Sequence, residues 1–340
     1  MCIRDRFKDQ SFDFTATVAE RLAEAGAVLV AKLTLGALAM GDKWFGGMTR
    51  NPWNPDQGSS GSSAGSASAV SAGLVGFAIG TETYGSIVSP SRRCGATGLR
   101  PTFGRISRHG CMPLSWTMDK LGPIARGVED CAIVLDAVHG FDGHDPSAVD
   151  QPFDWPGSKP LDQLKVGYIK SRTKTDERSD LKVLKKLGVQ LVEISLPNKY
   201  PVSSIVMMLE SEASTVFDDI TRKHITESLN SWPDTFRRGQ FIPVVEYLRA
   251  SRVRSLLLQE MRTVMEDVDL YVGGNDLALC NLTGHPTVVM PNGFREFNGR
   301  TVPGYITFTG RLYGEQNLLT VAQAWQNETG FHLKRPDLDS

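Results

Sequence analysis

The stretch that decides the fold is GSSGSSAGSASAVSAGLVGFAIGTETYGS, residues 58–86. It begins as a glycine-serine loop, and such runs are usually flexible linkers. A linker stays polar, whereas this stretch leads into apolar residues that we expect to be buried: Ala69, Val70, Ala72, Leu74, Val75, Phe77, Ala78 and Ile79. Glycine also gives a ligand access to backbone N–H groups. The pattern therefore predicts a pinned loop, a buried helix and a second glycine-serine turn, with catalytic groups at both turns.

The composition is that of an ordinary globular protein. The chain has 340 residues, of which 41% are hydrophobic and 22% charged, so it can build a sizeable core. Its net charge of −1, without a long basic run, indicates no direct nucleic-acid partner and no membrane partner. Five scattered cysteines show no metal-ligand spacing, and no signal peptide is visible. We expect reduced thiols, no metal, no other cofactor and a cytoplasmic location.

Apolar periodicity indicates alternating helices and strands along the chain. Two strands flank a helix near its middle, a βαβ rhythm that is typical of parallel pairing. The expected helices are 15–25, 87–94, one within 123–140, 179–187, 203–229, 241–268 and 317–329. The expected strands are 27–31, 164–168, 189–196, 270–272, 287–290 and 305–309.

Residues 61–65, GSSAG, match the G-x-S-x-G pattern of the nucleophile elbow in α/β-hydrolases. That elbow needs a strand directly before it, and the preceding NPWNPDQGSS (51–60) does not look like one. Asp269 or Asp276, followed by His285, would complete a triad in the right chain order, so the pattern is kept as an alternative. We expect the six histidines to be surface or structural residues.

Residues 83–86, TYGS, form a second candidate, which we call the Ser86 turn. The turn ends a buried segment and opens a helix, so its N–H groups would converge on one point as an oxyanion hole. Ser86 would then attack the carbonyl carbon beside it. The competing interpretation is that Ser86 merely caps the helix, which the local pattern alone favours because serine is a preferred N-cap.

Four segments together resemble the amidase signature family. They are AKLTLGALAMG (31–41), residues 51–87, CGATGLRPTFGRISRHG (94–110) and LSWTMDKLGPIARGVEDC (114–131), and NLTGHPTVVMPNGF (281–294) also matches. The resemblance implies an α/β class: a single α/β/α domain over residues 11–340, with a mixed, mostly parallel sheet covered by helices on both faces. It implies hydrolysis of an amide C–N bond, with a small-molecule amide as the substrate and a homodimer as one possible assembly.

The resemblance also assigns roles in a Ser-Ser-Lys triad. Ser86 would be the nucleophile that forms the acyl-enzyme. Ser62, held in a cis peptide, would relay a proton to a lysine, and Ser63 would support the loop. The oxyanion turn would be Thr83, Tyr84 and Gly85, where Tyr84 replaces the family's usual glycine and would be strained if that position needs a positive φ. Trp116 either lines the pocket or packs beneath a loop.

The family's catalytic lysine lies in an upstream segment that this sequence does not match. Lys32 matches a different, non-catalytic lysine motif, so we expect it to reach solvent or a carboxylate, and Lys8-Asp9 is only a two-residue echo. We interpret residues 1–10 as a sequence-assembly scar or a truncated start, and the domain as lacking its N-terminal segment. Two alternatives stay open: an amidotransferase A-type subunit that releases ammonia for a partner, and a catalytically inactive binding or scaffold domain.

Overall fold

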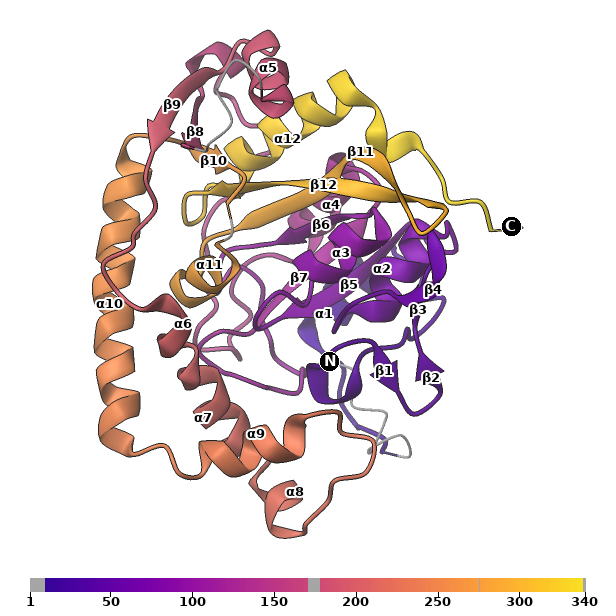
Figure 1. The fold of residues 1–340 in the computed structure, drawn as a ribbon, viewed down its shortest axis with the longest axis vertical. Helices are drawn as coiled ribbons and strands as arrows, with labels where there is room; N and C mark the ends of the chain where they lie inside the picture. Colours follow the sequence, from indigo (N-terminus) through magenta and orange to yellow (C-terminus); the bar gives the residue numbers. More distant parts are fainter. Residues whose placement is uncertain (1–9, 171–177, 275, 339–340) are drawn as a thin grey trace.

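The computed structural model describes residues 10–170, 178–274 and 276–338, and Figure 1 shows their arrangement. The helices are α1 (Thr17–Glu24), α2 (Ala64–Ser71), α3 (Val88–Cys94), α4 (Val128–Val138), α5 (Ser179–Lys186), α6 (Val202–Ile205), α7 (Met207–Val216), α8 (Asp218–Arg222), α9 (Trp232–Gly239), α10 (Val244–Glu266), α11 (Leu277–Thr283) and α12 (Glu315–Thr329). The central strands are β5 (Phe77–Glu82), β6 (Thr97–Arg100), β7 (Lys120–Ala125), β8 (Lys165–Ile169), β9 (Gln190–Ile194), β10 (Leu270–Val272), β11 (Thr287–Phe297) and β12 (Arg300–Gly310). Two small hairpins pair β1 (Lys43–Trp44) with β2 (Gly47–Met48), and β3 (Arg50–Asn51) with β4 (Asn54–Gly58).

The centre of the molecule is an eight-stranded sheet in the order β5-β7-β6-β11-β12-β10-β8-β9. It is mixed, as predicted, and β8 runs parallel to β9, which confirms the βαβ unit around α5. The expectation that the sheet is mostly parallel is wrong: β10 with β8 and β8 with β9 are its two parallel pairings, and the other neighbours are antiparallel. Long hairpins such as β11–β12 need no crossover helix, so antiparallel order dominates that half of the sheet.

Helices cover both faces of this sheet, as predicted (Figure 1). On one face α4 and α12 pack against β6, β7, β11 and β12, and α1 packs on α4. On the other face α2 and α3 lie against β5, β6 and β11. A third group of helices, α6, α7, α9 and α10, packs around a separate apolar cluster beside α11, with the long α10 at the edge of the molecule. Among the described residues no helix has the length and apolar character to cross a membrane.

The glycine-serine block, residues 58–86, forms α2 and β5, which pack closely because their residues are small. A Cβ at Gly65 would lie 2.5 Å from the Thr34 backbone nitrogen, and one at Gly80 would lie 2.9 Å from Ser63 Oγ. The α2 residues Ala64 and Ala67 are fully buried. Larger side chains there would push the helix off the sheet, so this segment is a packed part of the core and not a linker.

Three local predictions are wrong. Residues 27–31 do not form a strand, and Val28 is 82% exposed. Leu74 is 74% exposed because α2 ends at Ser71 and the chain turns at the surface before β5. The helix expected over 203–229 is broken into α6, α7 and α8. Apolar periodicity predicts neither where a helix breaks nor whether a strand finds a partner. The cysteines of the described part, Cys94, Cys111, Cys131 and Cys280, are unpaired.

Candidate active site

The Ser62 loop, residues 58–63, is fixed by hydrogen bonds to its surroundings. The Gly61–Ser62 peptide bond is cis, as the resemblance implies. The Ser62 carbonyl accepts a bond from the Gly36 N–H at 3.1 Å. Ser63 Oγ accepts from the Thr81 N–H at 3.0 Å and lies 3.1 Å from the Thr81 carbonyl oxygen, to which it donates. Ser63 therefore ties the loop to the edge of β5, in the supporting place expected for it.

The Ser62 hydroxyl is the exception in this well-bonded loop. Ser62 is 1% exposed, and within the described residues its Oγ has no hydrogen-bond partner. A buried hydroxyl without a partner costs free energy, so its presence calls for an explanation. Ser62 Oγ is thus a buried hydroxyl that no group of the described residues satisfies.

The Ser86 turn connects the end of β5 at Glu82 to the start of α3 at Val88. Its positive φ falls on Gly85, at 91°, and not on Tyr84, so tyrosine is tolerated without the strain considered above. The Tyr84 side chain is 43% exposed. A Cβ on Gly85 would lie 2.7 Å from Cδ2 of Leu277, so the turn needs glycine for both reasons.

Ser86 does not cap α3. The N-cap position is Ile87, whose own side chain makes no capping hydrogen bond. The N–H groups of Ile87 and Val88, which have no acceptor within the helix, donate to Glu82 Oε2 at 2.8 and 2.9 Å. The structure therefore removes the capping interpretation and leaves the Ser86 hydroxyl, on a residue that is 9% exposed, without that structural role.

The two serine segments are brought together in space. The Ser63 N–H donates to the Ser86 carbonyl at 3.1 Å, so Ser62 and Ser86 lie on adjoining backbone segments although 24 positions separate them. This contact joins the loop that carries the unpartnered hydroxyl to the turn that carries the exposed tyrosine and the glycine. The two candidate serines therefore belong to one local structure.

The buried carboxylate of Glu82 holds the end of the turn, where α3 begins. Glu82 Oε1 accepts from Arg100 Nη1 at 2.9 Å and from Asn281 Nδ2 at 2.8 Å, while Oε2 accepts the two N–H groups at the start of α3. Burial alone would raise the pKa of Glu82, but the charges of Arg100 and Lys120 and these hydrogen bonds lower it to about 2. Glu82 therefore stays ionised and fixes the backbone directly after Ser86.

A second carboxylate holds the other side of the turn. Thr83 Oγ1 donates to Asp119 Oδ1 at 2.5 Å, and Asp119 Oδ2 accepts the N–H groups of Leu114 and Ser115 at 2.7 and 3.0 Å. Burial raises the pKa of Asp119, although these hydrogen bonds oppose the rise. Thr83 thus anchors the turn through its hydroxyl.

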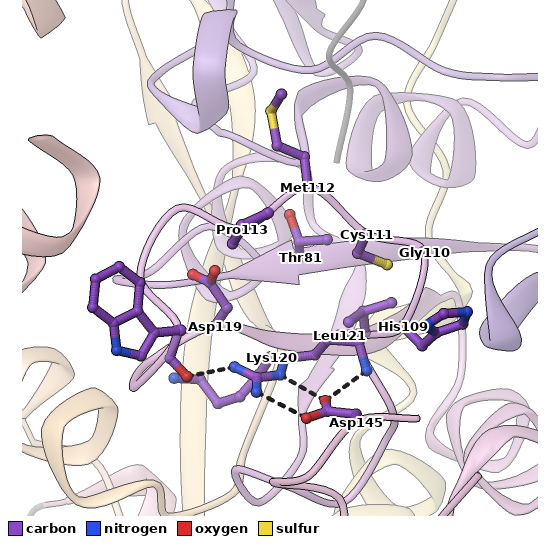
Figure 2. Close-up of a pocket in the computed structure, with 12 residues that line it drawn as sticks. Thr81, His109, Gly110, Cys111, Met112, Pro113, Asp119, Lys120, Leu121 and Asp145 are labelled. Carbon is purple, nitrogen blue, oxygen red and sulfur yellow. Dashed lines mark hydrogen bonds and ion pairs between the residues drawn. The ribbon is translucent and has the colours of Figure 1, made fainter. Parts of the chain in front are cut away.

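A cavity of about 290 Å³ is lined by Thr81 of β5, by Asp119 and Lys120, and by the loop that carries Trp116 (Figure 2). Trp116 lines this cavity and is 43% exposed, so it does not pack beneath a loop. Its carbonyl accepts from Arg108 Nη1 at 2.6 Å, and Arg108 pairs with Asp145 at 2.8 Å. Ser62 and Ser86 are not among the residues that line the cavity. Its apolar wall comes from Met112, Pro113 and Leu121.

The α/β-hydrolase alternative fails on geometry. His285 Nδ1 pairs with Thr283 Oγ1 at 2.8 Å, and burial lowers the pKa of His285 to about 4. Asp269 accepts from Lys159 at 2.8 Å, and Asp276 accepts from the Tyr271 hydroxyl. The residues before the motif do form a strand, β4, which is a correction, but it belongs to a two-stranded hairpin and not to the central sheet. The aspartates and the histidine of the expected triad are therefore committed to other partners.

Of the lysine candidates from the sequence, only Lys32 lies in the described part of the chain, and it does not hydrogen-bond to the Ser62 hydroxyl. Lys32 is exposed, as expected for a non-catalytic lysine, and Lys8-Asp9 lies outside the described residues. The sequence interpretation missed the buried charges beneath the turn, Glu82, Asp119 and Lys120. Their signal was available, because each is a charged residue beside or within an apolar strand, and such residues are buried only when paired.

A family model described as Amidase matches residues 4–274. The A subunit of the glutamyl-tRNA(Gln) amidotransferase of Marinomonas sp. (strain MWYL1) is 31% identical over 96% of this chain and 79% of its own length. The same subunit of Geobacillus sp. (strain WCH70) is 32% identical over 96% of this chain and 79% of its own length. The chain is also similar to the crystal structure of that subunit from Thermotoga maritima (TM-score 0.82, 26% identity, 100% of this chain and 83% of that one). It is similar as well to the structure of native peptide amidase from Stenotrophomonas maltophilia. That comparison has a TM-score of 0.79 and 26% identity, and it covers 96% of this chain and 78% of that one.

Proposed function

The chain belongs to the amidase family of amide-cleaving enzymes, and from this premise we propose that it cleaves a carboxamide C–N bond through an acyl-serine intermediate on Ser86. The observation that carries the proposal is the buried, unpartnered hydroxyl of Ser62 beside the Ser86 turn. A relay residue needs a hydroxyl that gives one proton while it accepts another. Ser62 is free to do both, whereas Ser63 is already bonded to Thr81.

The proposed reaction has two halves. Ser86 Oγ attacks the substrate carbonyl carbon, its proton passes to Ser62 Oγ, and Ser62 passes its own proton to an amine base. N–H groups of the Ser86 turn stabilise the oxyanion, the C–N bond breaks, and the relay returns a proton to the leaving nitrogen. Water then hydrolyses the ester. The resemblance implies that a lysine is the base, and no amine of the described residues hydrogen-bonds to Ser62.

We place the acyl side of the substrate toward the cavity beside Asp119. Its apolar wall of Met112, Pro113, Trp116 and Leu121 suits a partly apolar acyl group. Tyr84 lies two residues before Ser86 on the turn, and it is 43% exposed. No metal or cofactor enters the proposed reaction.

A fluorophosphonate probe tests the assignment, because it labels an activated serine covalently. We expect labelling of the wild type and none of Ser86→Ala. The matched control is Ser68→Ala, which changes a serine of the same block whose hydroxyl donates to the Arg50 carbonyl at 2.8 Å. Full labelling of Ser86→Ala would overturn the assignment.

A second candidate function is to serve within an amidotransferase. It is favoured by the relatives that are named as the A subunit of the glutamyl-tRNA(Gln) amidotransferase, at 31–32% identity. In that role Ser86 would release ammonia from an amide for a partner chain. Co-purification with a partner, and ammonia release that rises when the partner is added, would support it. A purified chain that hydrolyses amides at the same rate with and without partners would favour the independent amidase.

A catalytically inactive scaffold is the third interpretation of the chain. It requires that no probe labels the wild type, so the labelling experiment separates it from both enzymatic functions.

A further inference from the structure

A buried lysine lies opposite Glu82, the residue directly before the Ser86 turn, and the proposed reaction gives it no role. Lys120 is the first residue of β7, is 2% exposed, and pairs in register with Glu82 of β5. Residues directly opposite on antiparallel strands point to the same face of the sheet. The Lys120 amino group donates to the Met118 carbonyl. An ammonium group has three donors, so one carbonyl does not satisfy it.

The two carboxylates next to Lys120 are those that hold the turn. Asp119, its chain neighbour, accepts the Thr83 hydroxyl before Ser86. Glu82, its partner across the strands, accepts the N–H groups of Ile87 and Val88 after Ser86. The turn is therefore held on both sides by buried anions, and Lys120 is adjacent to both.

The charged groups around Lys120 include two anions and two cations. Four charged groups face its amino group: Glu82 of β5, Asp119 beside it, Arg100 of β6 and Arg254 of α10. Arg100 is committed to Glu82, to the His285 carbonyl and to Thr287. Arg254 is committed to the carbonyls of Leu282 and Thr117. Because neither arginine pairs with Asp119, the positive charge that acts on Asp119 is that of its chain neighbour Lys120.

We propose that Lys120 is a positioning residue for the Ser86 turn: its positive charge keeps Asp119 and Glu82 together as ionised acceptors for the groups on either side of Ser86. The inference rests on the proposed role of Ser86 as nucleophile. Burial, together with the charge of Arg100, lowers the pKa of Lys120 to about 7 against the attraction of Glu82 and Asp119. The hold on the turn therefore weakens as pH rises through neutrality.

The test compares Lys120→Met, which keeps the length but removes the charge, with Lys120→Arg, which keeps the charge but does not titrate. Lys182→Met, an exposed lysine of α5, is the matched control. We expect fluorophosphonate labelling of Ser86 to slow by about tenfold or more in Lys120→Met, as when a charged anchor of an oxyanion site is lost. Labelling should persist in Lys120→Arg. Relative to Lys120→Arg, the wild type should lose labelling rate as the pH rises through about 7.

Hydrogen exchange of peptides covering residues 83–88 gives a readout that needs no activity. Exchange should be faster in Lys120→Met than in the wild type. In the wild type, after correction for intrinsic rates, it should increase with pH through neutrality, which keeps the test valid if a variant fails to fold. If the wild type is not labelled, the assignment of Ser86 fails, and the exchange data alone decide on Lys120. Labelling and exchange in Lys120→Met within about twofold of the wild type, with no pH effect on the wild-type peptides, would overturn the proposal.

Discussion

Replacing Glu82 by glutamine tests how the Ser86 turn is held. Glu82 has four acceptor contacts: Arg100 and Asn281 on one oxygen, and the N–H groups of Ile87 and Val88 on the other. A glutamine amide has one oxygen and one NH2 group, so in either orientation two of these donors would face another donor. The substitution also leaves the buried Arg100 without its anionic partner.

The loss of free energy of unfolding can be worked out from the broken ion pair between Glu82 and Arg100. Removing one partner of a buried ion pair costs about 3–5 kcal/mol because the other charge stays buried and unpaired. For a chain of 340 residues the entropy of unfolding is about 0.7 kcal/mol/K, so Tm should fall by about 4–7 °C. The assay is urea and thermal unfolding followed by circular dichroism, together with the labelling rate of Ser86.

The control for this prediction is Glu193→Gln. Glu193 is an exposed glutamate of β9 that lies 3.5 Å from Lys170, and such surface pairs contribute about 0–1 kcal/mol. An unfolding free energy of Glu82→Gln within about 1 kcal/mol of the wild type would refute the argument that this carboxylate anchors the turn.

Three further predictions follow from the same site. Ser62→Ala should slow Ser86 labelling by about 100-fold or more while the unfolding free energy changes by less than about 1 kcal/mol, since the lost hydroxyl had no partner among the described residues; a large loss of stability would show a structural role instead. Gly85→Ala should abolish labelling and cost about 1–3 kcal/mol because of its φ of 91° and the contact with Leu277, whereas Gly188→Ala, at φ 85° in open space, should leave labelling intact. The Lys120 amine loses its proton near pH 7 when folded and near pH 10.5 when unfolded, so the folded state binds fewer protons in that window. The unfolding free energy of the wild type relative to Lys120→Met should therefore rise with pH by at most about 5 kcal/mol, and a flat difference in pH-dependent urea unfolding would contradict it.

Part of the fold could be predicted because local sequence patterns carry it. The strands β8 and β9 and the helix α5 between them follow from apolar runs separated by an amphipathic helix, and parallel pairing is the ordinary outcome. Residues 27–31 have the same apolar character as a buried strand, yet they form none. Pairing depends on a neighbour elsewhere in the chain, which a local pattern does not contain.

The candidate site also has a part that the sequence predicts and a part that only the structure shows. The serines came from the glycine-serine block and its resemblance to a known family, and the cis Gly61–Ser62 bond agrees with it. The choice between a cap and a free hydroxyl at Ser86 needed the structure, because it depends on Glu82 taking the helix N–H groups. The sequence marks Lys120 as a charge beside an apolar strand, but its partner Glu82 follows only from the register of β5 with β7.

The most direct test of the central claim is to trap the acyl-enzyme. The chain is incubated with an activated ester of a partly apolar acid, quenched in acid, and digested for peptide mass spectrometry. The account predicts an acyl group on Ser86, in the peptide that follows β5, with the adduct absent from Ser86→Ala. An acyl group on Ser62 or Ser63 with Ser86 unmodified would contradict it.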